Sequence, residues 1–267
     1  METILIILVV IGVLILLFGL VTQQQKKKQA IVQPIADDFK KILEKDVAFY
    51  SGLDATKKQE FENRMMHFLA TTRITGVKTT VEEIDKVYIA ASAIIPIFGF
   101  AGWEYNNLNE VLLYPDSFDH DFAQTGEGRN TLGVVGDGAY NNIMILSQHE
   151  LRQAFINKTG KENTAIHEFV HLLDKTDGSV DGLPEYFVSK QYAVPWLQLI
   201  HKEIKKILAN RSDINPYGAT NEGEFFAVVS EYFFERPDLL ESKHPELYEL
   251  LSQLFKQQPH LSKKTGV

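Results

Sequence analysis

The segment at residues 164–178, TAIHEFVHLLDKTDG, places two histidines and a glutamate in a stretch that otherwise has the pattern of a buried helix. Polar side chains buried in this way cost free energy unless they find partners. His167 and His171 are four residues apart, so on a helix they lie on one face about one turn apart. Two neutral imidazoles at this spacing can bind one metal ion and leave positions open for water. We therefore expect one Zn²⁺ per chain, a metal that imidazole suits well.

Glu168 directly follows the first histidine, which completes the motif H-E-x-x-H. In this motif the glutamate acts as general base toward a water that the metal activates. The alternative is two ordinary histidines on an amphipathic helix. Against it stand the apolar flanks, which predict that the motif is enclosed: Ala165, Ile166, Phe169, Val170, Leu172 and Leu173.

A catalytic zinc site needs a third protein ligand. Positions 174 and 177 are aspartates, so no further histidine follows at the H-E-x-x-H-x-x-G-x-x-H spacing. A later apolar helix, EFFAVVSEYFFE, offers Glu224 and Glu231, two turns apart on one face. Glu224 also fits a capping box with Asn221, in which its carboxylate would bond the Asn221 amide instead of a metal. From the pattern alone, Glu224 and Glu231 are equal candidates.

Three aspartates that follow the motif have no assigned role. Asp174 shares the stripe of the histidines in the last turn of the helix, where a negative charge opposes the helix dipole. We expect it either to accept a hydrogen bond from a ligand histidine or to be a solvated surface residue. Asp177 and Asp181 do not have the spacing of an EF-hand calcium loop.

The N-terminus carries an uninterrupted apolar run at residues 4–21, followed by QQQKKKQ. As a helix, this run spans about 27 Å, close to the roughly 30 Å of a bilayer's hydrocarbon core. A cleaved signal peptide would have a basic start, a shorter run and a small-residue cleavage site. The lysines at 26–28 belong on the cytoplasmic face. The sequence therefore predicts a single-pass anchor in the inner (cytoplasmic) membrane with the catalytic part in the cytoplasm.

Composition excludes several classes of protein. The chain has no cysteine, which rules out disulfide frameworks and cysteine-ligated zinc or iron–sulfur sites. The net charge of −8 and the lack of a basic stripe in the body argue against a nucleic-acid partner. The chain is long enough, at 267 residues, for one large domain or two small lobes.

Periodicity and turn signals predict an α+β, mainly helical chain. We expect helices over 36–50, 54–72 and 79–95, the third opened by a capping box Thr80-x-x-Glu83, then helices from 164, 195, 224 and 245. Short strands are expected within 109–118 and 140–151, with a glycine-rich loop or hairpin at 124–138 between them. The predicted organisation is a transmembrane anchor (1–22), a polar linker (23–34), an N-terminal helical subdomain (35–105), a zinc metallopeptidase subdomain (106–258) and a tail (259–267).

Two blocks, HEFVHLLDKTDG…DGLP and YGATNEGEFFAVVSEYFFERPDLL, together with the strand end YPDSF, resemble the Mlc titration factor A family of zinc-dependent peptidases. The similarity extends from about residue 35 to 258. It implies a zincin-like, gluzincin-type domain similar to the catalytic domain of anthrax lethal factor. Carried over to this sequence, it implies His167, His171 and Glu224 as zinc ligands and Glu168 as catalytic base.

The resemblance also implies a role for Tyr217, whose hydroxyl would stabilise the oxyanion. Without the resemblance, Tyr217 would be read as a turn tyrosine packed beside Pro216. Family members are associated with aminopeptidase-type activity and with binding of the repressor Mlc. The best-known member is soluble, whereas this chain begins with a predicted anchor, so peptidase activity transfers to it more directly than an Mlc-like transcription-regulator partner does.

The sequence leads to a main functional hypothesis and two rivals. The main one is a membrane-anchored zinc metallopeptidase that hydrolyses a peptide or protein substrate, with an extended peptide pairing to a strand near 141–147. The first rival is a membrane-tethered regulatory protein that sequesters a transcription factor or other partner, with zinc in a structural role. The second is a metal-dependent hydrolase of a non-peptide amide. Catalysis requires Glu168, whereas binding alone does not.

Overall fold

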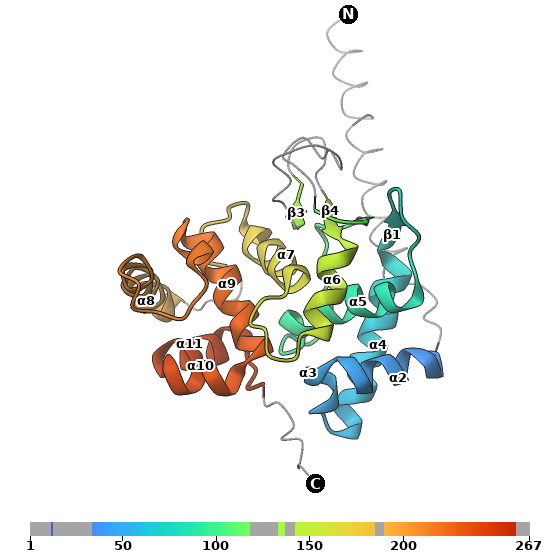
Figure 1. Cartoon of the computed structure of the whole chain (residues 1–267), viewed down its shortest axis with the longest axis horizontal. Helices are drawn as coiled ribbons and strands as arrows, with labels where there is room; N and C mark the ends of the chain where they lie inside the picture. Colours follow the sequence, from blue (N-terminus) through green and yellow to red (C-terminus); the bar gives the residue numbers. More distant parts are fainter. Residues whose placement is uncertain (1–11, 13–33, 118–132, 137–141, 185–189, 260–267) are drawn as a thin grey trace, which may run out of the picture. The chain divides into compact units, whose positions relative to one another are not determined.

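The computed structural model describes residues 12, 34–117, 133–136, 142–184 and 190–259 (Figure 1). The described residues from 34 onward belong to one compact unit, which is separate from residues 1–33. The predicted anchor at 4–21 lies, apart from Gly12, outside the described residues. Within the described ranges, no helix has both the length and the apolar character needed to cross a bilayer.

The compact unit begins with helices α2 (Asp37–Asp46), α3 (Ala48–Ser51) and α4 (Ala55–Thr71). The single helix predicted over 36–50 is interrupted at Val47, which has an extended backbone (φ −100°, ψ 94°). Asp54 is the N-cap of α4, as predicted, and its side chain accepts a hydrogen bond from the Lys57 amide at 2.9 Å.

Helix α5 (Glu83–Ile97) is almost entirely buried and crosses the core. The capping box predicted from Thr80 and Glu83 is wrong. The box is formed instead by Glu82 and Asp85, with the Glu82 amide donating to Asp85 Oδ2 at 2.8 Å. Asp85 is fully buried, and Arg152 pairs with the same carboxylate at 2.7 Å. Because that tertiary ion pair fixes Asp85, it decides where the helix starts.

The sheet is small and mixed, in the order β1-β2-β4-β3. β1, β2 and β4 are parallel, and β3 pairs antiparallel with β4. The strands are β1 (Arg73–Gly76), β2 (Glu110–Tyr114), β3 (Gly133–Val135) and β4 (Ile143–Ser147). β2 and β4 confirm the predicted strands. Within the glycine-rich segment, for which a loop or hairpin was expected, the described residues 133–136 include β3, and the rest of the segment lies outside the described residues. β1 was not predicted.

The strand predicted to extend to residue 151 ends at Ser147, and a helix begins there. Ser147 is the N-cap of α6 (Gln148–Ile156), and its Oγ accepts a hydrogen bond from the Glu150 amide at 3.2 Å. The segment Ser-x-x-Glu is itself a helix-start signal. The apolar run before Ser147 therefore led to a predicted strand that is too long, because the helix start at Ser147 was not recognised.

The remaining helices form the C-terminal half. Helix α8 begins five residues before the predicted Pro195, which lies in its interior. The elements are α7 (Thr164–Asp174), η2 (Lys175–Asp177), α8 (Lys190–Leu208), η3 (Pro216–Ala219), α9 (Glu222–Glu235), α10 (Pro237–Lys243) and α11 (Pro245–Phe255).

One hydrophobic core extends from Phe39 in α2 to Phe255 in α11. It crosses the boundary predicted at 105/106, and that subdomain division stays a prediction. α7 is central to this core, since it contacts α5, α6, α9 and β3 (Figure 1). The chain is thus a mainly helical α+β domain whose H-E-x-x-H helix is packed on several sides.

Candidate metal centre

Helix α7 is enclosed, as its apolar flanks predicted. Its N-cap, Asn163, is fully buried and accepts a hydrogen bond from the Ile166 amide at 3.1 Å. Six apolar residues of α7 are at most 1% exposed: Ala165, Ile166, Phe169, Val170, Leu172 and Leu173. This packing leaves the two histidines on the side of α7 that meets α9.

Three side chains converge between α7 and α9. The Nε2 atoms of His167 and His171 are 3.0 Å apart. Glu224 Oε2 lies 3.0 Å from His167 Nε2 and 3.4 Å from His171 Nε2. One ligand atom from each residue lies within 4.8 Å of the others. Two imidazole nitrogens and one carboxylate oxygen can together hold a metal ion and leave a further position for water.

The electrostatics of this cluster favour positive charge. Burial opposes a charged His167, but the Glu231 charge and the hydrogen bonds with Glu224 and Glu231 raise the pKa of His167 to about 10. Burial would raise the pKa of Glu224, but its hydrogen bonds with His167 and His171 hold that pKa well below its usual range. The glutamates around the histidines therefore favour a cation at this position, either a proton on His167 or a metal ion that replaces it.

The structure separates the two glutamates that the pattern left equal. The Glu224 amide donates to Asn221 Oδ1 at 2.9 Å, so Asn221 caps α9, while the Glu224 carboxylate meets the histidines at their Nε2 atoms. Glu231 lies on the other side of His167, with its Oε1 2.7 Å from Nδ1. Glu224 is therefore the carboxylate of the candidate site, in agreement with the ligand set that the family resemblance implied.

Glu168 is buried beside the cluster, at 5% exposure. Burial raises the pKa of its carboxyl, and the neighbouring histidines oppose that rise. Strand β3 passes directly against it, since a Cβ added at Gly133 would lie 2.7 Å from Glu168 Cγ and 2.8 Å from its Oε1. Only glycine permits so close an approach of the strand to this side chain.

Tyr217 in η3 lies beside the cluster and is 53% exposed. Its ring centroid is 6.0 Å from that of His167. Burial raises the pKa of its hydroxyl, and the charges of Glu224 and Glu168 add to that effect. The turn that carries it is held by Asn215, whose Oδ1 accepts from the Tyr217 amide at 3.0 Å. A role of this hydroxyl in stabilising an oxyanion stays a prediction.

Asp174 is neither a surface residue nor a partner of a ligand histidine. It is fully buried, and its Oδ2 accepts a hydrogen bond from the Gly182 amide at 2.8 Å. Both ring nitrogens of His167 face glutamates, and Nδ1 of His171 has no hydrogen-bond partner among the described residues. Asp174 thus holds the loop that follows α7, a role the sequence did not reveal.

Gly182 links that loop to two other helices. Its carbonyl accepts a hydrogen bond from Trp196 Nε1 of α8 at 2.6 Å. Its φ is +75°, and an added Cβ would lie 2.4 Å from the Glu222 carbonyl oxygen at the start of α9. Asp181 is exposed and accepts from the Leu183 amide at 3.1 Å, so it stabilises the turn. The side chain of Asp177 lies outside the described residues.

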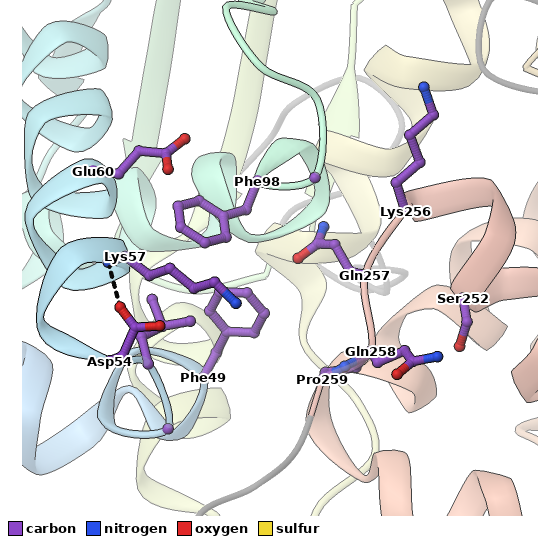
Figure 2. A pocket seen from close by; sticks show the side chains of 13 residues that line it. Phe49, Asp54, Lys57, Glu60, Phe98, Ser252, Lys256, Gln257, Gln258 and Pro259 are labelled. Carbon is purple, nitrogen blue, oxygen red and sulfur yellow. Dashed lines mark hydrogen bonds between the residues drawn. The ribbon is translucent and has the colours of Figure 1, made fainter.

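A separate hollow of about 750 Å³ lies elsewhere in the fold (Figure 2). Phe49 and Phe98 form one wall, and Lys256 and Gln257, which follow α11, lie opposite. Gly99 brings the two sides together, because an added Cβ there would lie 2.1 Å from the Phe255 carbonyl oxygen. No residue of the metal cluster lines this hollow.

Comparison with known proteins supports the metal-centre interpretation. The model of the family "Glucose-regulated metallo-peptidase M90" matches residues 21–256, which include every residue of the cluster. An uncharacterised Synechocystis protein, slr2042, is 28% identical over 87% of this chain and 88% of its own length.

Several relatives carry the name Mlc titration factor A. The Serratia proteamaculans protein is 28% identical over 64% of this chain and 68% of its own length. The Escherichia coli protein (strain 55989) is 25% identical over 80% of this chain and 84% of its own length. With a family match across most of its length, this chain belongs to peptidase family M90, the family of Mlc titration factor A.

Proposed function

We propose that this protein is a zinc-dependent metallopeptidase with a gluzincin-type site and a zincin-like domain similar to that of anthrax lethal factor. The observation that carries the proposal is the convergence of His167 Nε2, His171 Nε2 and Glu224 Oε2 beside a buried Glu168. Membership of a metallopeptidase family supports it. The three converging residues would hold Zn²⁺, which when bound polarises a water molecule and lowers its pKa.

The side chains of this chain divide the chemistry between them. Glu168 takes the proton of the attacking water and later delivers it to the leaving amine. Its raised pKa suits a group that must both accept and return a proton. The Tyr217 hydroxyl donates a hydrogen bond to the oxyanion that develops on the peptide carbonyl. The core around α7 holds Glu168 in place for these transfers.

A peptide substrate would pair with β3 rather than with β4. The prediction that a peptide pairs with the strand near 141–147 is wrong, because β4 is already paired with β2 on one side and β3 on the other. β3 ends the order of the described strands and lies against α7. An extended peptide added to that edge would run beside Glu168.

The proposed location is the cytoplasmic face of the inner membrane, through a single N-terminal span. The apolar run at 4–21 and the lysines at 26–28 support it. The proposed substrate is a peptide or protein in the cytoplasm, cut in an aminopeptidase-type manner.

The proposal is tested with the purified full chain and a peptide mixture that contains free and acetylated N-termini. We expect cleavage that stops when a chelator removes the metal and returns when zinc is restored. Cleavage confined to peptides with free N-termini would establish the aminopeptidase type. No cleavage by the zinc-loaded chain would contradict the proposal.

A second candidate function is the capture of a transcription regulator. It is supported by the relatives named Mlc titration factor A, whose name states what they titrate. We propose that this chain binds a regulator of that kind at the membrane. Pull-down of the candidate regulator by the Glu168→Gln variant separates the two functions, since binding survives this change and hydrolysis does not.

Gly133→Ala is expected to slow peptide hydrolysis by about 10- to 100-fold while zinc stays bound, because misplacing a catalytic group by about 1 Å has an effect of this size. The new methyl group would lie 2.7 Å from Glu168 Cγ and 2.9 Å from Thr164 Cγ2, so the base must move. Hydrolysis rate and zinc content are measured together.

Val134→Ala is the control, since it alters the next residue of β3 without adding an atom beside Glu168. An unchanged rate in Gly133→Ala would show that Glu168 does not need its observed position.

A further inference from the structure

We propose that Glu231 is a positioning residue for the metal centre: it orients His167 and ties that orientation to the start of α7. This inference rests on the proposed zinc site and gives Glu231, which the sequence offered as an alternative third ligand, a different role. It concerns the side of His167 that faces away from Glu224.

The geometry uses both oxygens of a buried carboxylate. Glu231 is 6% exposed, and its Oε1 lies 2.7 Å from His167 Nδ1. Its Oε2 accepts a hydrogen bond from the backbone amide of Asn163 at 2.5 Å. An ionised carboxylate only accepts hydrogen bonds, so the proton of a neutral His167 must be on Nδ1. The lone pair is then on Nε2, which is the atom that faces Glu224 and His171.

Through its hydrogen bond with Asn163, Glu231 also contacts the start of helix α7. Asn163 is the N-cap of α7, and its side-chain Nδ2 donates to Glu235 Oε1 at 2.7 Å. Glu231 and Glu235 are one turn apart on α9, so α9 holds both the backbone and the side chain of the residue that begins α7. The same helix supplies Glu224. One face of α9 therefore supplies the third ligand, Glu224, and orients the ring of the first ligand, His167. The same face also holds the residue at which α7 begins.

A purely structural role for Glu231 would have a different signature. Removing a buried carboxylate that only stabilises the fold lowers the melting temperature without changing how the folded protein holds zinc. Removing a group that orients a ligand histidine lowers zinc affinity in protein that is folded, by about 10- to 100-fold.

The test uses the full chain with Glu231→Ala and Glu231→Gln. Zinc dissociation constants are measured by competition with a chelator of known affinity. We expect the constant to rise by about 10- to 100-fold in Glu231→Ala and by less in Glu231→Gln, whose amide oxygen can still accept from Nδ1. If the alanine variant does not fold, the glutamine variant carries the test.

Glu62→Gln is the matched control. Glu62 is also a buried carboxylate, 4% exposed, but it lies in α4 and accepts from the Tyr50 hydroxyl at 2.6 Å. We expect this variant to lose stability and to keep the wild-type zinc constant.

A second readout reports on the ring itself. In the zinc-loaded wild type, the Nδ1 proton of His167 should give a downfield NMR resonance that exchanges slowly with water. At saturating zinc, that resonance should be lost in Glu231→Ala and retained in Glu62→Gln.

Wild-type zinc affinity and an unchanged Nδ1 resonance in both Glu231 variants would overturn this inference and leave the zinc site intact. Failure of the wild type to bind zinc would instead overturn the proposed function. The two failures are therefore distinguishable.

Discussion

Glu168→Gln is expected to reduce peptide hydrolysis by about 10²- to 10⁴-fold, the usual contribution of a general base. Glutamine has nearly the same shape but cannot accept the proton of the attacking water. Glu168 is not among the three converging ligand residues, so zinc content should stay at the wild-type value. The measurements are kcat/KM on a cleaved peptide and zinc per chain.

Glu162→Gln provides the matched control. It makes the same chemical change at an exposed residue just before α7. We expect wild-type hydrolysis and wild-type zinc in this variant. Full activity in Glu168→Gln would remove Glu168 from the mechanism and leave the regulatory binding function as the better proposal.

Gly182→Ala is expected to lower the free energy of unfolding by about 3 kcal/mol or more. A left-handed backbone costs an alanine about 1–2 kcal/mol, and overpacking a close contact adds about 1–3 kcal/mol. Here the φ is +75° and the contact atom is the backbone oxygen of Glu222, which cannot rotate away. For a domain of this size, the melting temperature should fall by about 6–12 °C.

Gly102→Ala separates the two contributions. Gly102 has nearly the same φ, +68°, but an added Cβ there would meet nothing within 4 Å. The free energy of unfolding of this control should fall only by the cost of the left-handed backbone. Equal losses in the two variants would show that the loop does not press against α9, whereas a larger loss in Gly182→Ala supports the observed packing at the start of the helix that carries Glu224.

The local parts of the site could be predicted from the sequence. H-E-x-x-H lies within one helix, so its spacing alone placed His167, Glu168 and His171 together. The apolar flanks also predicted correctly that the helix is enclosed. The third residue could not be chosen this way, because Glu224 and Glu231 share one face of α9. Their difference depends on which nitrogen of His167 each one meets, and that is a tertiary property.

The wrong predictions also arise because tertiary contacts cannot be read from a local pattern. Asp174 was expected at a histidine or at the surface, but it binds the Gly182 amide eight residues later in the chain. The start of α5 was misplaced because Asp85 pairs with Arg152, which is 67 residues away. The strand β1 follows α4 almost directly and has only four residues, RITG, too few for a period-2 pattern. Periodicity reports local structure, and these features are set by contacts between distant segments.

The candidate metal centre forms where helices α7 and α9 pack together. His167 and Glu224 are separated by 57 positions in the chain and meet at 3.0 Å. The loop held by Gly182, the N-cap Asn163 and the carboxylate of Glu231 all act on the relative position of these two helices. We therefore expect changes at this set of residues to affect metal binding without touching the metal.

The metal content of the purified full chain tests the existence of this centre most directly. Wild type and Glu224→Ala are reconstituted with zinc, dialysed and measured by elemental analysis beside Glu162→Gln. We predict one zinc per chain in the wild type and in Glu162→Gln, and none in Glu224→Ala. No zinc in the reconstituted wild type, or one zinc per chain retained in Glu224→Ala, would contradict a metal centre formed by His167, His171 and Glu224.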